Sequence, residues 1–243
     1  MKTIGLIGGM SWESTIPYYR IINQTIAERL GGLHSAKILL YSVDFQEIEE
    51  LQRTDRWAEA GALLADAAAR LEGGGADFLL LCTNTMHKVA PAIAARVTIP
   101  LLHIADATAE AIAAAGFGRV GLLGTRFTME QAFYKSRLED LHHLEVLIPP
   151  TEDRELVHNV IYRELCLGQV LEISRSEFRR ILGQLVAKGA QCVILGCTEL
   201  SLLVQDSDSS VPLFDTTYLH AHAAANRALI DAVPKSQDYA SNA

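Results

Sequence analysis

Short apolar runs alternate with longer amphipathic stretches along most of the chain. The runs show no regular polar alternation, which is typical of strands that are buried on both faces. The stretches between them have helical spacing, and such strand–helix alternation predicts an α/β fold with parallel sheets. The predicted strands are 4–7, 38–41, 78–82, 120–123, 146–148 and 192–195, and the predicted helices are 14–30, 56–72, 105–115, 128–141, 151–166 and 176–188.

Two segments of the first half recur, in the same order, in the second half. Residues 5–9 resemble residues 121–125, and residues 75–83 resemble residues 189–197. The offsets are 116 and 114 residues (121−5 and 197−83), so the two matches agree closely. Because convergence need not preserve both order and offset, we interpret the matches as a duplication.

The duplication predicts two pseudo-symmetric lobes, each a mainly parallel sheet flanked by helices, with a cleft between them. We assign residues 1–100 plus 211–243 to the first lobe and residues 101–210 to the second. The repeat sets the turn 83–85 (Thr-Asn-Thr) opposite the turn 197–199 (Cys-Thr-Glu). Both turns follow a buried strand, where open α/β sheets bind ligands. Two such turns facing one ligand suit chemistry on opposite faces of one carbon.

Cys197 is the strongest catalytic candidate among the four cysteines. It follows a strand and a glycine and begins a predicted helix, where the pKa of a thiol is lowered. Cys192 lies inside a predicted strand and Cys166 inside a predicted helix, so both are expected to be structural. Successive strand residues point to opposite faces, so we expect Thr83 to face the site and Cys82 to pack.

The histidines and glycines give weaker signals. His87 has two open interpretations, a side chain that orients the site or a histidine on a helix surface. His220 and His222 are expected to be structural and to lie on the last helix. No cluster of His, Cys, Asp and Glu has metal-ligand spacing, so we predict no metal. The glycines of residues 5–11 match neither a dinucleotide fingerprint nor a phosphate loop, and predict a tight turn beside a small ligand.

Composition narrows the class of protein further. The 243 residues carry 21 Lys and Arg against 29 Asp and Glu, a net charge of −8. This balance argues against a nucleic-acid surface, although a local site can still attract an anionic small substrate. No apolar run approaches the roughly 20 residues of a membrane span, and no signal-peptide pattern opens the chain. Cysteines this sparse suggest free thiols in a reducing cytosol, so we expect a cytoplasmic protein.

Several short motifs together resemble the aspartate/glutamate racemase family, and more narrowly its bacterial members specific for L-aspartate and L-glutamate. The resemblance covers nearly the whole chain. It implies a cofactor-independent enzyme without pyridoxal phosphate (PLP), an acidic amino acid as substrate, an active site between two lobes, and a homodimer. The motifs are Gly-Gly-Met-Ser (8–11), Cys-Thr-Asn-Thr-Met-His (82–87), Leu-Gly-Thr (123–125), Gly-Cys-Thr-Glu (196–199) and Asp-Thr-Thr (215–217).

The resemblance also implies roles for individual residues. In the family, two cysteines flank the α-carbon of the substrate, and one removes a proton while the other donates one to the opposite face. The second cysteine matches Cys197, whereas the first falls at Thr83 in this chain. Gln52 is matched only through its neighbourhood after Asp44. The positions that match the family's substrate pocket are Met10, Gln52, Asn84, Thr85, Thr125 and Thr198.

The threonine at position 83 departs from the family pattern. A thiol has a pKa near 8.5 and is easily poised as a base, whereas a threonine hydroxyl is far less acidic. Thr83 can donate or relay a proton, through a water if needed, but it is a poor base. In the family the second cysteine deprotonates the L enantiomer. The resemblance therefore implies a preference for L substrates, with Cys197 as the base and Thr83 as the weak acid.

Two other classes of function remain open at this point. Maleate isomerases, arylmalonate decarboxylases and hydantoin racemases share the two-lobed cleft and resemble this family. The pairs Asn84-Thr85 and Thr198-Glu199 favour the amino-acid racemases over these sister chemistries. The missing thiol at position 83 also admits a binding module for acidic amino acids that has lost catalysis.

Overall fold

Two separate parallel sheets organise the molecule, and the computed structural model describes residues 1–230. The strands of the first sheet are β1 (Ile4–Gly8), β2 (Ile38–Ser42), β3 (Phe78–Leu81) and β4 (Leu101–Leu102), and those of the second are β5 (Arg119–Gly124), β6 (Glu145–Leu147), β7 (Cys192–Gly196) and β8 (Leu213–Asp215). The orders are β2-β1-β3-β4 and β6-β5-β7-β8, with every neighbouring pair parallel. The two orders are equivalent, which confirms the two-lobed α/β fold.

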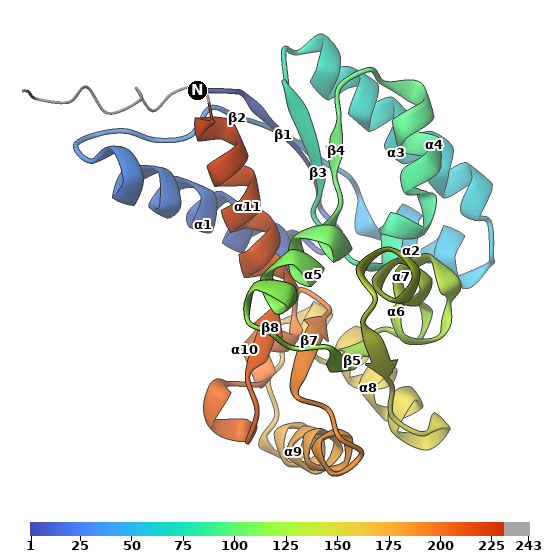
Figure 1. The fold of residues 1–243 in the computed structure, drawn as a ribbon. Coiled ribbons are helices and arrows are strands. Elements are labelled where there is room, and N and C mark those ends of the chain that lie inside the picture. Colours follow the sequence, from blue (N-terminus) through green and yellow to red (C-terminus); the bar gives the residue numbers. More distant parts are fainter. Residues whose placement is uncertain (231–243) are drawn as a thin grey trace, which may run out of the picture.

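Helices and short helical turns connect the strands. The helices are α1 (Trp12–Leu30), α2 (Phe45–Arg53), α3 (Trp57–Gly73), α4 (Ala90–Arg96), α5 (Ile104–Ala114), α6 (Arg126–Glu130), α7 (Ala132–Ser136), α8 (Thr151–Arg163), α9 (Glu172–Ala187), α10 (Leu200–Leu203) and α11 (Thr216–Leu229). The short turns are η1 (Thr85–Val89), η2 (Arg137–Leu141), η3 (Leu165–Leu167) and η4 (Asp206–Asp208). Figure 1 shows the first sheet in the upper half of the molecule and the second in the lower half.

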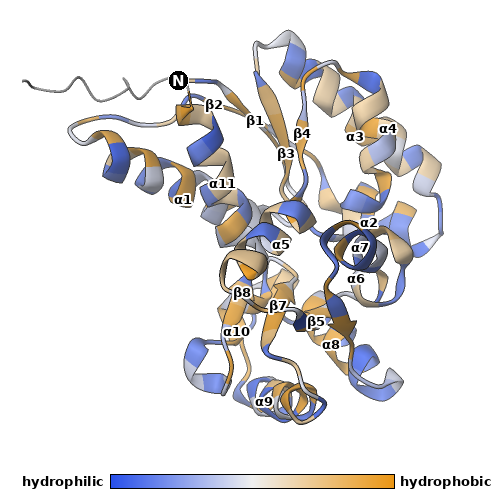
Figure 2. Cartoon of the chain, viewed as in Figure 1, coloured by the Kyte–Doolittle hydropathy of each residue, from blue (hydrophilic) through white to orange (hydrophobic). Residues whose placement is uncertain are grey.

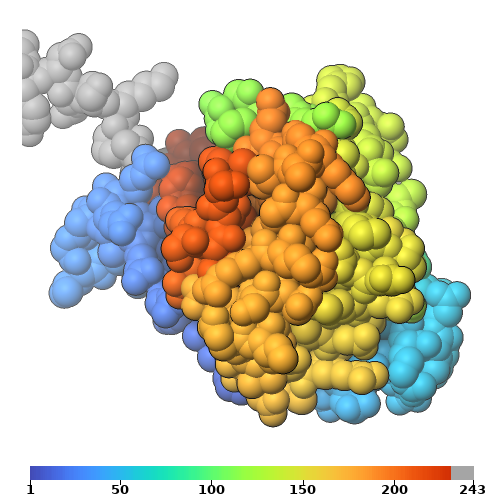
Figure 3. All heavy atoms as spheres, turned by 90° about the horizontal axis from the view of Figure 1, so that it is seen from below, coloured from blue at the N-terminus to red at the C-terminus, as the bar shows by residue number. Residues whose placement is uncertain are grey.

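Apolar side chains fill both faces of the sheets, as the unbroken apolar runs predict. Helices α1 and α11 cover one face of the first sheet, where Tyr18, Ala224 and Leu6 belong to one buried apolar cluster. Helices α3 and α4 cover the other face, where Leu64 and Ile93 belong to another. A further core fills the second lobe. Figure 2 shows that hydrophobic residues concentrate on the strands, and Figure 3 shows the second lobe from below with the first lobe at both sides of it.

The chain crosses between the lobes at slightly different points from those predicted. Strand β4 pairs with β3, so the first crossing follows Leu102, and β8 pairs with β7, so the return follows Asp215. The predicted boundaries, after residues 100 and 210, miss these strands because they are only 2 and 3 residues long. Residues 231–243 of the predicted first lobe lie outside the described residues.

Two predicted helices are shorter or broken. The stretch 128–141 contains an extended residue, Gln131, at φ −91° and ψ 146°, which separates α6 from α7. The stretch 151–166 leaves the helical conformation at Glu164, and Cys166 therefore lies in η3. Among residues 1–230, no helix is both long enough and apolar enough to cross a membrane.

Candidate active site

A narrow pocket lies between the lobes, at the carboxyl ends of the central strands. It brings together all the site residues named from the sequence. These are Met10, Gln52, Thr83, Asn84, Thr85, Thr125, Cys197 and Thr198. The remaining lining residues are Phe45, Ile161, Tyr162, Cys166, Gly196 and Glu199.

The turn that carries Cys197 depends on a close approach between β7 and β5. A Cβ atom at Gly196 would lie 2.8 Å from the carbonyl oxygen of Leu123, so the position accepts no larger residue without a backbone shift. Cys197 follows directly and is only 7% exposed. The helix after it, α10, begins at Leu200 and has only 4 residues. The thiol therefore does not stand at the N-terminus of a long helix.

Glu199 is the main residue that sequence reasoning missed. Its carboxylate, 3% exposed, accepts hydrogen bonds from the Cys197 thiol at 3.0 Å, the Thr198 hydroxyl at 2.7 Å and the Ser11 hydroxyl at 2.8 Å. The Cys166 thiol lies 3.8 Å from the same carboxylate. Two signals in the sequence could have assigned Glu199 a role. It belongs to the motif 196–199, and the repeat sets it opposite Thr85, a predicted site residue.

The pKa of the Cys197 thiol is raised well above its ordinary value. Burial is the largest cause and the negative charge of Glu199 is the second. The sequence-based expectation of a lowered thiol pKa is therefore wrong. Because no long helix begins at Cys197, no helix dipole stabilises its thiolate. The neighbouring carboxylate of Glu199 also disfavours a second negative charge.

The turn after β3 presents Thr83, Asn84 and Thr85 to the pocket from the first lobe. The Asn84 side-chain nitrogen donates to the Thr216 hydroxyl at 3.0 Å. Its carbonyl oxygen, Oδ1, is buried and has no hydrogen-bond partner within residues 1–230. Because an unsatisfied buried acceptor is costly, Oδ1 is suited to accept a hydrogen bond from a bound ligand.

Hydrogen bonds cross the pocket from lobe to lobe. The Thr85 and Thr125 hydroxyls are 2.9 Å apart, and the Tyr162 hydroxyl donates to Gln52 Oε1 at 2.9 Å. Together with the bond from Ser11 to Glu199, these contacts hold the two lobes around the pocket. Gln52 and Tyr162 also line a larger outer pocket of about 510 Å³, so the hydrogen bond between them separates the inner pocket from the outer one.

The charges are distributed unequally between the two pockets. Among residues 1–230, Glu199 is the only carboxylic acid in the lining of the inner pocket, and this lining contains no lysine, arginine or histidine. The outer pocket carries arginines and carboxylates together, with Arg126 and Arg163 among its cations. The hydrogen-bond donors that this lining offers to a ligand are therefore neutral groups.

Of the other three cysteines, two lie in the hydrophobic cores and one lines the pocket. Cys82 is fully buried in the core of the first lobe, as predicted, and Cys192 is fully buried in the core of the second. Cys166 differs from expectation, because the earlier end of α8 places it in the pocket lining. Within the described part of the chain, no group of three His, Cys, Asp or Glu side chains could hold a metal ion.

The three histidines considered in the sequence analysis all form side-chain hydrogen bonds. His87 is 2% exposed and its Nδ1 lies 2.7 Å from the Thr83 carbonyl oxygen, so it orients the site turn and is not a surface residue. His220 and His222 lie on α11, as expected. His220 lies between the Tyr18 hydroxyl and the Leu102 carbonyl, and His222 contacts Asn226.

Comparison with known proteins agrees with this fold and pocket. The family model described as Asp/Glu/Hydantoin racemase matches residues 7–224, and the chain belongs to this family. The family and its structural neighbours are amino-acid racemases, and the chain is accordingly an isomerase.

Three relatives illustrate the range of similarity. A proposed Asp/Glu racemase of Yersinia pestis is 58% identical, with a TM-score of 0.89 over 94% of this chain and 100% of that one. An aspartate racemase homologue of Pyrococcus horikoshii OT3 is 34% identical, with a TM-score of 0.81 over 94% and 99%. The broad-specificity amino-acid racemase RacX of Bacillus subtilis is 23% identical over 88% of this chain and 92% of its own length.

Proposed function

We propose that this protein racemises acidic amino acids, aspartate or glutamate, without a cofactor. The observation that carries the proposal is the presence of Thr83 and Cys197 in one pocket, on equivalent turns of the two lobes. A thiol on one turn and a hydroxyl on the other can serve opposite faces of one α-carbon. Among residues 1–230, no lysine that could form a Schiff base with PLP lines the pocket, which supports chemistry by side chains alone.

In this proposal Cys197 is the base and Glu199 takes the thiol proton. A buried thiol whose pKa is raised loses its proton to solvent only at high cost. Transfer along the 3.0 Å hydrogen bond to Glu199 leaves the total charge of the pair unchanged. The thiolate then removes the α-proton of an L substrate, and Glu199 keeps the proton that it received.

Thr83 supplies the proton to the opposite face. Its hydroxyl donates a proton to the carbanion, and the proton held by Glu199 then returns to the Thr83 oxygen through water. Cys197, Glu199 and Thr83 thus end the inversion in the protonation states in which they began it. The neutral donors of the pocket stabilise the negative charge that develops on the substrate carboxylate. Asn84 Oδ1, the unpaired buried acceptor, would receive a hydrogen bond from the substrate ammonium.

The preference for L substrates has a specific kinetic meaning. L and D enantiomers have equal free energy in water, so kcat/KM for racemisation must be the same in both directions. The asymmetry therefore concerns exchange of the α-proton with solvent. Cys197 exchanges the proton of the L enantiomer readily, whereas the D enantiomer depends on Thr83, a poor base.

We expect the Thr83→Cys variant to remove this asymmetry. In D2O the wild type should exchange the α-proton of L-aspartate much faster than that of D-aspartate. A thiol at position 83 is more acidic than the hydroxyl by several pKa units, so exchange of D-aspartate and net racemisation should both rise, by about tenfold or more. Proton NMR of both enantiomers measures the two exchange rates. An unchanged D/L exchange ratio in the variant would contradict the assigned role of Thr83, and Thr83→Ser serves as the control that keeps a hydroxyl.

A wider substrate range is the second candidate. It is favoured by the similarity to a broad-specificity racemase and by the inner pocket, where the described residues contribute no cationic side chain. Comparing exchange rates for aspartate and for alanine decides between the two, because only a site that recognises the distal carboxylate rejects alanine.

We also propose that the protein is a cytoplasmic homodimer. Trp12, Ile16 and Tyr19 on α1 and Leu40 on the edge strand β2 expose apolar side chains in one patch, with exposed fractions of 49% to 61%. Patches of this kind are typical of protein–protein contacts. Sedimentation velocity should show a dimer for the wild type and a shift toward the monomer for the Ile16→Glu variant. A wild type that sediments as a monomer would contradict the proposed homodimer.

A further inference from the structure

Apart from the inner and outer pockets of the candidate active site, the structure has a further pocket of about 360 Å³, called the second pocket below. One side chain, His87, lies between it and the Thr83 turn. Its walls come from both lobes, with η1, α4 and β4 on one side and α7 and η2 on the other. The apolar part of the lining consists of Ala90, Pro91, Ala94, Leu101 and Phe133. The polar part consists of His87, Lys88, His103 and Arg137.

His87 connects this pocket with the turn of the candidate active site. The backbone N–H of Ile104 donates to Nε2 of His87 at 3.2 Å, so the ring proton is on Nδ1, which donates to the Thr83 carbonyl at 2.7 Å. Burial is the main cause that lowers the pKa of His87 well below its ordinary value, and the neighbouring His103 adds to it. The neutral ring therefore joins the Thr83 turn to the first residue of α5.

His103 lines the second pocket and has a donor that the protein does not use. Its Nδ1 accepts the N–H of Ala105 at 3.2 Å, and burial lowers the pKa of this histidine to about 3. The ring is therefore neutral, with its proton on Nε2. His103 is 8% exposed, and Nε2 has no hydrogen-bond partner among residues 1–230.

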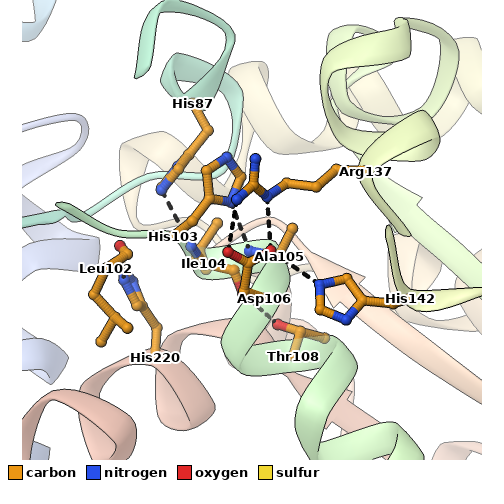
Figure 4. Close-up of polar contacts among 10 residues, drawn as sticks. All are labelled: His87, Leu102, His103, Ile104, Ala105, Asp106, Thr108, Arg137, His142 and His220. Carbon is orange, nitrogen blue, oxygen red and sulfur yellow. Dashed lines mark hydrogen bonds and ion pairs between the residues drawn. The ribbon is translucent and has the colours of Figure 1, made fainter. Parts of the chain in front are cut away.

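Arg137 and Lys88 add positive charge. Arg137 binds Asp106 through Nε and Nη2, both at 2.7 Å, which leaves Nη1 without a protein partner in the described structure. Figure 4 shows the Arg137 and His103 side chains beside each other, both adjacent to Asp106. The Lys88 nitrogen lies 3.8 Å from the centre of the Trp57 ring, and no carboxylate of the described residues forms an ion pair with it.

The two nearby carboxylates, Asp106 and Asp55, lie outside the lining of the second pocket. Asp106 is shared by Arg137 and His142, and it is not part of the pocket lining. Asp55 acts on Lys88 only at longer range. The pocket therefore combines two cations and one unpaired N–H donor with apolar walls, and no carboxylate of residues 1–230 belongs to its lining.

We propose that this second pocket binds a small organic anion, a carboxylate on an apolar group, through Lys88, Arg137 and His103. Charge-assisted hydrogen bonds of this kind are the strong ones, and the apolar group would lie against the walls. Because the lining comes from both lobes and His87 reaches Thr83, the bound anion acts on turnover at the active site. The binding itself does not depend on which reaction the enzyme performs.

Benzoate, with benzamide as its neutral analogue, tests the proposal. The chain has 2 tryptophans, so in a Trp12→Phe background the fluorescence of Trp57 reports on the neighbouring Lys88. We expect a saturable change with benzoate and none with benzamide at the same concentration, and calorimetry should give the same dissociation constant. His103→Asn keeps an N-cap for α5 but removes the Nε2 donor, and should weaken binding about 3- to 10-fold.

Charge variants complete the test. Lys88→Gln should weaken benzoate binding about tenfold by calorimetry. Arg96→Gln removes the same charge from an exposed site on α4, where Arg96 faces Asp66, and should change nothing. Equal binding of benzamide, or wild-type affinity in both Lys88→Gln and His103→Asn, would overturn the proposal.

Turnover measurements distinguish benzoate binding at the second pocket from benzoate binding at the active site. Saturating benzoate should change the rate of L-aspartate turnover in the wild type and have much less effect in Lys88→Gln. Simple competition with L-aspartate that persists in Lys88→Gln would place benzoate in the active site and refute the second pocket. If no turnover is found at all, the proposed function fails, while the binding experiments still decide on the pocket.

Discussion

Replacing Cys197 with alanine should reduce exchange of the α-proton of L-aspartate at least about 10³-fold, because positioned general bases contribute about 10²- to 10⁴-fold and no second thiol of this turn can substitute. Cys166 also lines the pocket, but it lies in η3. The measurement is the initial rate of signal loss for the α-proton in D2O. The thermal unfolding midpoint should stay within a few degrees, since one sulfur atom is removed at the edge of a pocket.

Cys192→Ala is the matched control for this experiment. Cys192 lies on β7, five residues before Cys197, and it is buried in the core of the second lobe. Its loss should cost about 1 kcal/mol of stability and leave exchange unchanged. If Cys197→Ala retained the wild-type rate while remaining folded, Cys197 could not be the base.

The Glu199→Gln variant should lose about 10²-fold or more in rate near neutral pH. Glutamine keeps the shape of the side chain but cannot take the thiol proton, so the Cys197 thiolate must form by loss of a proton to solvent. Burial alone raises the pKa of this thiol, so at neutral pH few variant molecules would carry the thiolate. As pH rises toward the thiol pKa, the fraction of thiolate increases and the rate of the variant should rise with it.

This pH profile distinguishes proton transfer from a purely structural role of Glu199. A variant that only disturbed the packing would lose activity by the same factor at every pH. Glu164→Gln is the control, because Glu164 accepts a hydrogen bond from Ser174 at 2.6 Å and does not line the pocket. A Glu199→Gln profile parallel to that of the wild type would show that Glu199 does not handle the proton.

The central strands and the site turns could be predicted from the sequence for physical reasons. Strands buried on both faces require unbroken apolar runs, and the repeat of these runs revealed the two lobes. The turns 83–85 and 197–199 were found because they directly follow such strands. The whole set of named pocket residues lines one pocket, which places Gln52 there although its sequence signal was weak.

The parts that could not be predicted depend on tertiary contacts. Strands β4 and β8 are too short to leave an apolar pattern, and they exist because they pair with β3 and β7. The helix break at Gln131 has no glycine or proline to signal it. The thiol pKa was predicted in the wrong direction because the carboxylate of Glu199 turns back onto the residue two positions before it.

The most direct test of the account is proton NMR of the wild type in D2O, without added cofactor, with L-aspartate, D-aspartate, L-glutamate and D-glutamate in turn. The account predicts loss of the α-proton signal, faster for an L enantiomer than for its D counterpart, with the opposite enantiomer appearing more slowly than exchange. No loss of the α-proton from any of the four, in protein that binds one of them, would contradict the account and indicate a binding module.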